Sequence, residues 1–336
     1  MTKRVTLGQV ATAANLSAAA VSRYLSGSLN LPDETRRRID RAVQELGYRP
    51  HHHARSLSRG RSDAIGLVMP DIDNPFFSKL AAAVERAADA RGLALMLCST
   101  SNKPAREIKY VETLGVGVVD GLLFATNHHD ADGALATAIN DAARIVIVDE
   151  DVPGTTVSKI FSDNCQGGHL AGRHMIEAGH RRLAYIGGPC DLMSAQERAE
   201  GLHRAVRDAG TDAAVVAELY GDYTTQHGMQ AMDDILAMTG APTAVFAGSD
   251  EILIGILRVA AARKITVGAD LSIVTFDDAG PLELMAPPIT AIRQPIEAIG
   301  ERALELMLAA IEGNAAPVVE RLPVELVVRR SVAHRV

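Results

Sequence analysis

Apolar residues recur at helical spacing near the start of the chain, at Leu7, Val10 and Ala14. Thr6 precedes them, and Gln9 follows Thr6 by three residues, which is the spacing of a capping box. The pattern therefore predicts a short amphipathic helix that begins after Thr6 and ends at the residue after Ala14.

A second short helix is predicted directly after the first. Ser17 can cap it, and Val21 and Leu25 then face inward. Two short helices joined by a tight turn form a helix-turn-helix. The outward face of the second helix is small at its start and carries one arginine, so it can lie in the major groove of DNA with the guanidinium near a guanine edge. That face consists of Ser17, Ala18, Ala19, Ser22 and Arg23.

A third helix is predicted over residues 33–48, DETRRRIDRAVQELGY. Its apolar side holds Ile39, Val43 and Leu46, and Gly47 provides a stop signal. Helical hairpins of enzymes show the same two-helix pattern, so two helices alone do not indicate DNA binding. Together the three helices can close a small core, which favours a DNA-binding head.

Four motifs in a fixed order resemble the N-terminal domain of the lactose-repressor (LacI/GalR) family of transcription regulators: VTLGQVA, SAAAVSR, ETRRRI and ELGYRP. The likeness continues through ARSL, from Ala54 to Leu57, to nearly the whole chain. It implies a helix-turn-helix head over 1–49 and a hinge over 50–62. The DNA-binding residues that it implies are Thr6, Ser17, Ala18, Ala19, Ser22, Arg23, Ala54 and Leu57.

The hinge of this family folds into a short helix on operator DNA and inserts a leucine between the central base pairs of the minor groove, which here implies Leu57. A disordered linker is the alternative in the absence of DNA. Ala18 and Ala19 stand where several family members carry polar base readers, and Ala20 stands where threonine is usual. Since alanine forms no side-chain hydrogen bonds, sequence readout is expected to depend on Arg23 and on the Leu57 step.

Beyond the hinge the pattern changes to apolar runs of strand length that alternate with helical stretches. This alternation predicts parallel sheets covered on both faces, and the cycle restarts after Ile160. The strands are expected within 64–70, 93–100, 118–126, 144–151, 181–188, 243–249 and 271–278, with a late strand at 289–293. The helices are expected near 77–91, 105–114, 166–178, 195–209, 225–238 and 251–263.

The predicted fold class is an N-terminal all-α helix-turn-helix head plus an α/β body of two doubly wound parallel-sheet lobes. The family resemblance implies that the body, residues 63–336, is periplasmic-binding-protein-like and that the chain crosses between its lobes three times. We expect these crossings near 161–164, 290–293 and 321–324. Lobe 1 then spans about 63–161 and 293–321, and lobe 2 about 164–290 and 324–336.

Ligands of open parallel sheets bind beyond the carboxyl ends of the strands, and polar and aromatic residues gather there in this sequence. Carboxylates and a guanidinium can hydrogen-bond vicinal hydroxyls while aromatic rings cover the C–H faces of a sugar, so a carbohydrate site is predicted. Taken singly, these residues also fit core packing, helix caps or a surface ion pair. The predicted ligand-binding residues are Asp71, Phe76, Phe77, Asp149, Glu150, Arg198, Tyr223, Ser249, Phe276, Asp277 and Gln294.

The body resembles ribose-type members most, with two departures. Glu150 stands where those relatives usually have an arginine, and Ser249 stands where they have an asparagine. Losing a cation and gaining an anion disfavours an acidic effector such as a sugar phosphate. A neutral sugar, a polyol or an amino-bearing sugar is therefore expected.

The distribution of charge separates the predicted head from the predicted body, as the hydrophobic pattern does. Residues 1–61 contain 11 Lys and Arg against 4 Asp and Glu, whereas the remaining residues contain 23 against 37. A basic head on an acidic body presents one end to phosphates. The alternative for the basic run at 36–41 is a solvated helix face.

No metal site and no cofactor are expected. The triple histidine from His51 to His53 is unsuited to a metal because consecutive side chains diverge. Three cysteines, Cys98, Cys165 and Cys190, lie far apart without a metal-ligand spacing, which indicates buried thiols in a reducing compartment. No signal peptide and no membrane span is recognised in the sequence, so a cytoplasmic location is expected.

The sequence thus predicts a sequence-specific repressor, with no membrane association, that binds a palindromic operator on double-stranded DNA as a homodimer and responds to a carbohydrate-like effector. The end of the chain lacks leucine heptads, so no coiled-coil tetramer is expected. A sugar-binding protein of the same fold without a DNA role is one alternative, and a regulator that responds to a nucleoside or purine is another. An enzyme is not expected, because Asp277 and Asp278 are adjacent on a strand end and face opposite ways.

Overall fold

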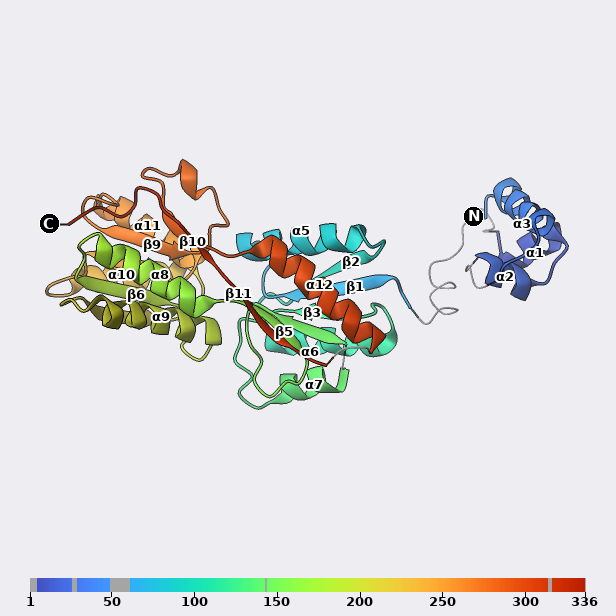
Figure 1. The fold of residues 1–336 in the computed structure, drawn as a ribbon, viewed down its shortest axis with the longest axis horizontal. Helices are drawn as coiled ribbons and strands as arrows, with labels where there is room; N and C mark the ends of the chain where they lie inside the picture. Colours follow the sequence, from blue (N-terminus) through green and yellow to red (C-terminus); the bar gives the residue numbers. More distant parts are fainter. Residues whose placement is uncertain (1–4, 26–28, 49–60, 143, 314–315, 336) are drawn as a thin grey trace. The chain divides into compact units, whose positions relative to one another are not determined.

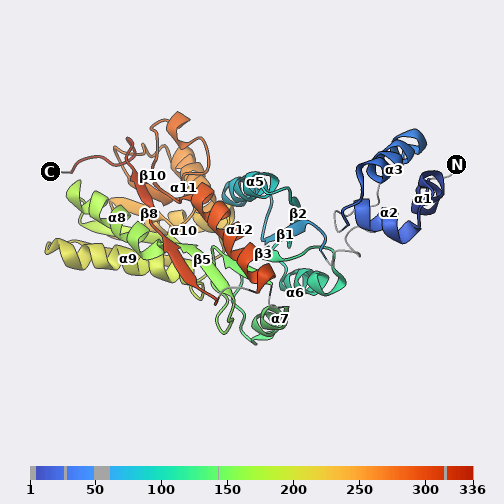
Figure 2. The ribbon, with the colours of Figure 1, turned by 45° about the vertical axis from the view of Figure 1, so that its right-hand side comes forward.

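The computed structural model describes residues 5–25, 29–48, 61–142, 144–313 and 316–335. Within this part the chain forms two units, a head (residues 1–64 with 117–120) and a body (65–116 with 121–336). Figure 1 and Figure 2 show the elements of each unit. Ala54, Leu57 and the triple histidine lie outside the described residues, so their expected roles stay predictions.

The described residues of the head form three helices: α1 (Leu7–Ala14), α2 (Ala18–Leu25) and α3 (Asp33–Leu46). The capping box of α1 is present, since Thr6 N donates to Gln9 Oε1 at 2.8 Å and Gln9 N donates to Thr6 Oγ1 at 3.4 Å. Asn15, with φ of 53°, ends this helix in the left-handed conformation. These observations confirm the first predicted helix.

The other two predicted helices of the head are present as well. Ser17 Oγ accepts from Ala20 N at 3.2 Å at the start of α2. Gly47 ends α3 with φ of +62°, two residues before the predicted end at Tyr48, because its left-handed backbone stops the helix. The small core that the three helices enclose includes Val10, Val21 and Ile39.

The body contains two six-stranded sheets. The first has the order β11-β5-β4-β3-β1-β2. Its strands are β1 (Ala64–Met69), β2 (Ala94–Ser99), β3 (Leu122–Phe124), β4 (Ile145–Val148), β5 (Ser158–Ser162) and β11 (Val319–Leu322). We call this sheet and its helices lobe 1. These helices are α5 (Pro75–Asp89), α6 (Pro104–Glu112), η1 (Thr113–Val116), α7 (Ala134–Ala142) and α12 (Ile296–Glu312).

The second sheet has the order β12-β10-β9-β8-β6-β7 and, with its helices, is called lobe 2. Its strands are β6 (Arg182–Gly187), β7 (Ala214–Tyr220), β8 (Ala244–Ala247), β9 (Ser272–Phe276), β10 (Thr290–Arg293) and β12 (Glu325–Val327). Only β12 among its described pairings runs antiparallel, against β10. The helices are α8 (Asn164–Glu177), α9 (Met193–Ala209), α10 (Thr225–Ala237), α11 (Asp250–Arg263) and the short η2 (Leu282–Leu284).

Both sheets are buried between helices, as the near-continuous apolar runs predict. In β6, Leu183 and Tyr185 pack with the helices α8 and α9, whereas Ala184 and Ile186 pack with α10 and α11. In lobe 1, α5 and α12 lie side by side over one face of the sheet (Figure 1; Figure 2). The alternation of side chains along a strand thus provides both faces with a core.

Four strands were not predicted from the sequence: β5, β7, β11 and β12. Charged side chains interrupt three of them, with Lys159 in β5, Glu218 in β7 and Glu320 in β11. The predicted run at 118–126 contains a strand of only three residues, β3, because the turn at Asp120 and Gly121 shortens it. The strands that were missed or predicted too long therefore contain charged residues or lie next to a glycine.

Glycines allow α8 and α9 to approach each other closely. A Cβ added at Gly168 would lie 2.0 Å from the carbonyl oxygen of Arg198, and one added at Gly201 would lie 2.1 Å from the carbonyl oxygen of Cys165. No flexible side-chain end is available to give way at either point. The backbone position of Arg198 therefore depends on the missing side chain at residue 168.

We expect Gly168→Ala to destabilise the protein by about 1 to 3 kcal/mol, because two backbones must move apart. Urea unfolding measures this loss. Gly280→Ala is the control, since no atom lies within 4 Å of its added Cβ. Equal stability of the two variants would contradict the close packing described above.

Candidate functional site

A buried arginine lies at the centre of the body. Arg198 comes from α9, and its guanidinium carbon stands 3.6 Å from the centroid of the Phe276 ring. Its Nε donates to Asn164 Oδ1 at 2.8 Å and its Nη1 donates to the carbonyl oxygen of Gly248 at 2.5 Å. These contacts hold the planar guanidinium in one orientation.

Carboxyl groups from three chain segments line the same pocket as this arginine. Asp149 follows β4 and Asp277 follows β9, both with φ of 75°, and Asp250 is the first residue of α11. Asp277 Oδ1 accepts from Gln294 Nε2 at 2.5 Å, and Gln294 Oε1 accepts from Ser162 Oγ at 2.5 Å. The carboxyl ends of strands from both sheets therefore meet here, as the rule for parallel sheets requires.

Burial changes the pKa values of these carboxyl groups. Burial raises the pKa of Asp149 to about 8, and the nearby guanidinium of Arg198 offsets only part of this rise. Burial also raises the pKa of Asp250 and of Asp277. Asp250 Oδ2 is buried and has no hydrogen-bond partner within the described part of the chain. Near neutral pH a protonated Asp149 can donate a hydrogen bond as well as accept one, and Asp250 Oδ2 is an acceptor that needs a donor.

Aromatic rings complete the wall. Phe76 and Phe77 begin α5, pack edge to face with centroids 5.1 Å apart, and are preceded by the helix cap Asn74. Tyr223 OH and Ser194 Oγ are hydrogen-bonded at 2.9 Å. The pocket between the lobes has a volume of about 40 Å³, room for a few water molecules. Its lining is Asn74, Phe76, Phe77, Asn127, Asp149, Ser194, Arg198, Tyr223, Ser249, Asp250, Asp277 and Gln294.

The structure brings eight of the eleven predicted ligand residues into this lining: Phe76, Phe77, Asp149, Arg198, Tyr223, Ser249, Asp277 and Gln294. The other three lie elsewhere. Asp71 Oδ1 accepts from Asp73 N in a turn, and Phe276 lies beneath Arg198. Glu150 turns away from the pocket and binds backbone amides of α9.

Four lining residues were not predicted as ligand residues. Asn74 caps α5 by accepting from Phe76 N at 2.9 Å, and Asp250 follows Ser249, which is the cap of α11. Asn127 follows the short β3, and the strand-end rule could have found it. Ser194 lies in the first turn of α9, four residues before Arg198, and this helical spacing could have found it.

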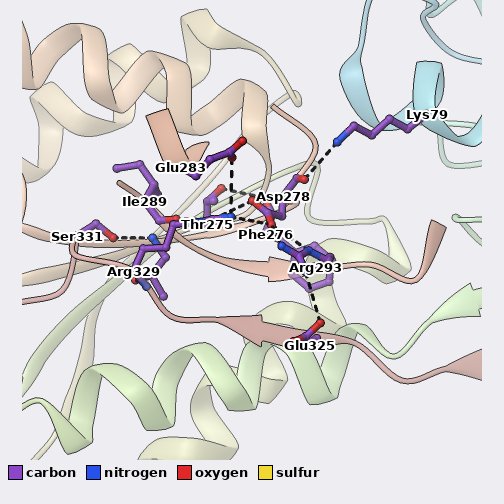
Figure 3. A network of polar contacts seen from close by, with 11 residues as sticks. Lys79, Thr275, Phe276, Asp278, Glu283, Ile289, Arg293, Glu325, Arg329 and Ser331 are labelled. Atoms are coloured by element: carbon purple, nitrogen blue, oxygen red, sulfur yellow. Dashed lines mark hydrogen bonds and ion pairs between the residues drawn. The ribbon is translucent and has the colours of Figure 1, made fainter. Parts of the chain in front are cut away.

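A second polar network fixes the end of β9 next to the pocket (Figure 3). Asp278 accepts from Arg293 Nη2 at 2.6 Å and from Arg329 Nη1 at 2.9 Å. The hydrogen bonds and charges of these arginines lower the pKa of Asp278 against the effect of burial. Lys79 Nζ, from lobe 1, donates to the carbonyl oxygen of Asp278 at 3.5 Å. Asp277 and Asp278 therefore face different partners, as predicted.

The predicted DNA-binding face of the head is partly accessible. Ser17, Ala18, Ala19 and Arg23 are exposed, whereas Ser22 is half-buried. Thr6 is exposed and takes part in the capping box. Among the described residues no group of three or more His, Cys, Asp or Glu is arranged to hold a metal ion. None of the helices described is long and apolar enough to cross a membrane.

A helix-turn-helix head joined to a two-lobed body with a central polar pocket defines the class of DNA-binding regulators that respond to small molecules. Residues 6–51 match the family model described as bacterial regulatory proteins, lacI family. Residues 173–332 match the model of the periplasmic binding protein-like domain.

Comparisons with whole proteins agree. The chain is 32% identical to the HTH-type transcriptional regulator DegA of Bacillus subtilis, over 98% of each chain. It is 31% identical to the ribose operon repressor of Escherichia coli, over 91% of this chain and 93% of that one. The structure of the lac repressor dimer bound to operator and an anti-inducer superposes with a TM-score of 0.86 at 27% identity, over 98% of this chain and 100% of that one. This chain belongs to the LacI family and is a DNA-binding transcription regulator.

The raised pKa of Asp149 predicts how stability depends on pH. Its pKa of about 8 in the folded state lies above the ordinary value of 3.8, so its contribution to stability is present below about pH 4 and is lost as the pH rises to 8. We expect Asp149→Asn to flatten the fall in melting temperature of the ligand-free protein between pH 5 and about 8. The exposed Asp191→Asn is the control. A profile as steep as that of the unmodified protein would contradict the assignment.

Proposed function

We propose that this regulator is a repressor that binds a two-fold symmetric operator as a homodimer, and that its operator affinity is set by a small carbohydrate-like effector. The observation that carries the proposal is the pocket around Arg198. Its buried guanidinium and carboxylates match the vicinal hydroxyls of a sugar or polyol, and Phe76, Phe77 and Tyr223 supply surfaces for the C–H faces.

The effector class follows from the charges of the pocket. Asp149, Asp250 and Asp277 line the pocket with one cation, Arg198, and Asp250 Oδ2 has no donor among the described residues. A neutral sugar, a polyol or an amino-bearing sugar supplies donors, whereas a fully ionised phosphate or carboxylate supplies none and is repelled by each carboxyl group that is ionised. A nucleoside is the second candidate, since its ribose carries the same hydroxyls and its base can stack on the aromatic rings.

The dimer is supported by the surface of lobe 1. Met96 and Leu97 lie on the edge strand β2 and are 41% and 45% exposed. An apolar edge strand attracts another chain unless it is covered, so a second copy seated there is favourable. A symmetric dimer matches two heads to two operator half-sites. The effector then acts by changing the angle between the lobes and thereby the spacing of the hinge segments, with a coupling free energy between the two sites.

No catalytic activity is proposed for the pocket, because Asp278 is held by two arginines and does not share a reactant with Asp277.

A protein that regulates transcription in a bacterium acts on DNA in the cytoplasm, and we propose that location for this regulator.

The effector is tested by a thermal-shift panel of D-ribose, other neutral sugars, polyols, amino sugars, nucleosides and sugar phosphates. A ligand at 100 times its Kd stabilises the folded state by about 2.7 kcal/mol, so a neutral or amino sugar is expected to raise the melting temperature. Arg198→Lys is expected to abolish the rise, because a lysine cannot reproduce the planar fork. The exposed Arg204→Lys on the same helix is the control. A rise with sugar phosphates alone would refute the effector class.

The DNA contact is tested at Arg23. We expect Arg23→Ala to weaken binding to an operator selected from random duplexes by about 1 to 3 kcal/mol, because a base-edge contact is lost. Arg41→Ala, exposed on α3, is the control. Fluorescence anisotropy at fixed salt measures both affinities. An unchanged affinity and footprint for the Arg23 variant would show that another face of α2 reads the DNA.

A further inference from the structure

Glu150 connects the two lobes at the edge of the pocket. It directly follows Asp149, but the two side chains point in different directions. Asp149 lines the pocket, whereas Glu150 does not line it and is buried, with 2% of its surface exposed. Glu150 Oε1 accepts from Met193 N at 2.8 Å, and Oε2 accepts from Ser194 N at 3.2 Å. Both oxygens of a lobe 1 carboxylate are thus used by amides of lobe 2.

These amides belong to the first turn of α9, which lacks a cap of its own. The N-cap residue of this helix is Leu192, whose side chain offers no hydrogen-bond acceptor. The first amides of a helix need acceptors, and a negative charge is favourable at that end. Glu150 therefore caps α9 from the opposite lobe.

The cap also determines the shape of the pocket wall. Ser194, whose amide is bound by Glu150, is hydrogen-bonded to Tyr223 through its hydroxyl at 2.9 Å. Arg198 follows Ser194 by one helical turn on the same face of α9. Three lining residues therefore depend on where the first turn of α9 is held.

A second bridge between the lobes provides a comparison on the same helix. Arg321 of β11 binds Glu197 of α9 at 2.7 Å. Both side chains are partly exposed, with 37% and 26% of their surface accessible, so this pair is screened by solvent. The buried Glu150 contact is the stronger tie, since it also provides acceptors for amides that have no other cap.

We propose that Glu150 is a positioning and specificity-determining residue that holds α9 against lobe 1, fixes Ser194 and Tyr223 in the wall, and occupies the amides that an anionic ligand group would need. This proposal rests on the proposed function, because it concerns the same pocket. It also changes the reason for rejecting acidic effectors. Glu150 does not repel them from inside the pocket; it fills the helix end that attracts anions.

Hydrogen exchange tests the positioning role without any ligand. Glu150→Gln keeps one acceptor oxygen, and Glu150→Ala removes both. We expect amide exchange in a peptide covering 190–200 to accelerate about fivefold in Glu150→Ala and less in Glu150→Gln. Glu197→Gln is the matched control, because it breaks the other bridge on the same helix and leaves the cap intact. Equal exchange in Glu150→Ala and Glu197→Gln would overturn the positioning role.

Inorganic phosphate tests the specificity role. In the unmodified protein, phosphate is expected to raise the melting temperature only through its general exclusion from the protein surface, which acts on the variant as well. In Glu150→Ala the vacated amides are expected to bind phosphate, so the melting temperature rises more steeply with phosphate concentration; Glu150→Val, which also lacks an acceptor, serves if the alanine variant does not fold. Equal phosphate responses in variant and unmodified protein would overturn the specificity role. Neither readout uses a sugar, so failure of the sugar panel would leave both results interpretable.

Discussion

The buried guanidinium of Arg198 is the feature on which the body depends. It stacks on Phe276 and donates to Asn164 and to the backbone of Gly248, so α8, α9 and two strand ends of lobe 2 are tied to one group. A buried cation is costly without compensation, and the acceptors on Asn164 and Gly248, the Phe276 ring and the nearby carboxyl groups provide it. The same groups give the pocket its polar lining.

Much of the fold could be predicted, because alternation and period report burial directly. The capping box at Thr6 and the stop at Gly47 appear as expected. Strands with charged residues, such as β7, were missed, since such a strand does not show a continuous apolar run. Tertiary pairing with β6 makes it a strand nonetheless.

The site residues at strand ends could be predicted from their polar character. The direction in which each side chain points could not. Asp149 and Glu150 are adjacent, and the sequence analysis assigned both to the ligand. In the structure Glu150 accepts hydrogen bonds from the amides of Met193 and Ser194. Its orientation therefore depends on a helix end more than forty residues away. Ser194 was missed for the same reason, because its place in the wall follows from that contact.

Each lobe contains a pair of neighbouring acidic residues with divided tasks. In lobe 1, Asp149 lines the pocket while Glu150 binds α9 of lobe 2. In lobe 2, Asp277 lines the pocket while Asp278 binds Arg293 and Arg329 and its carbonyl contacts Lys79 of lobe 1. Since consecutive Cα atoms are about 3.8 Å apart, one peptide unit separates a group that lines the pocket from a group that joins the lobes. A movement of either pocket carboxyl group is therefore one peptide unit away from a contact between the lobes.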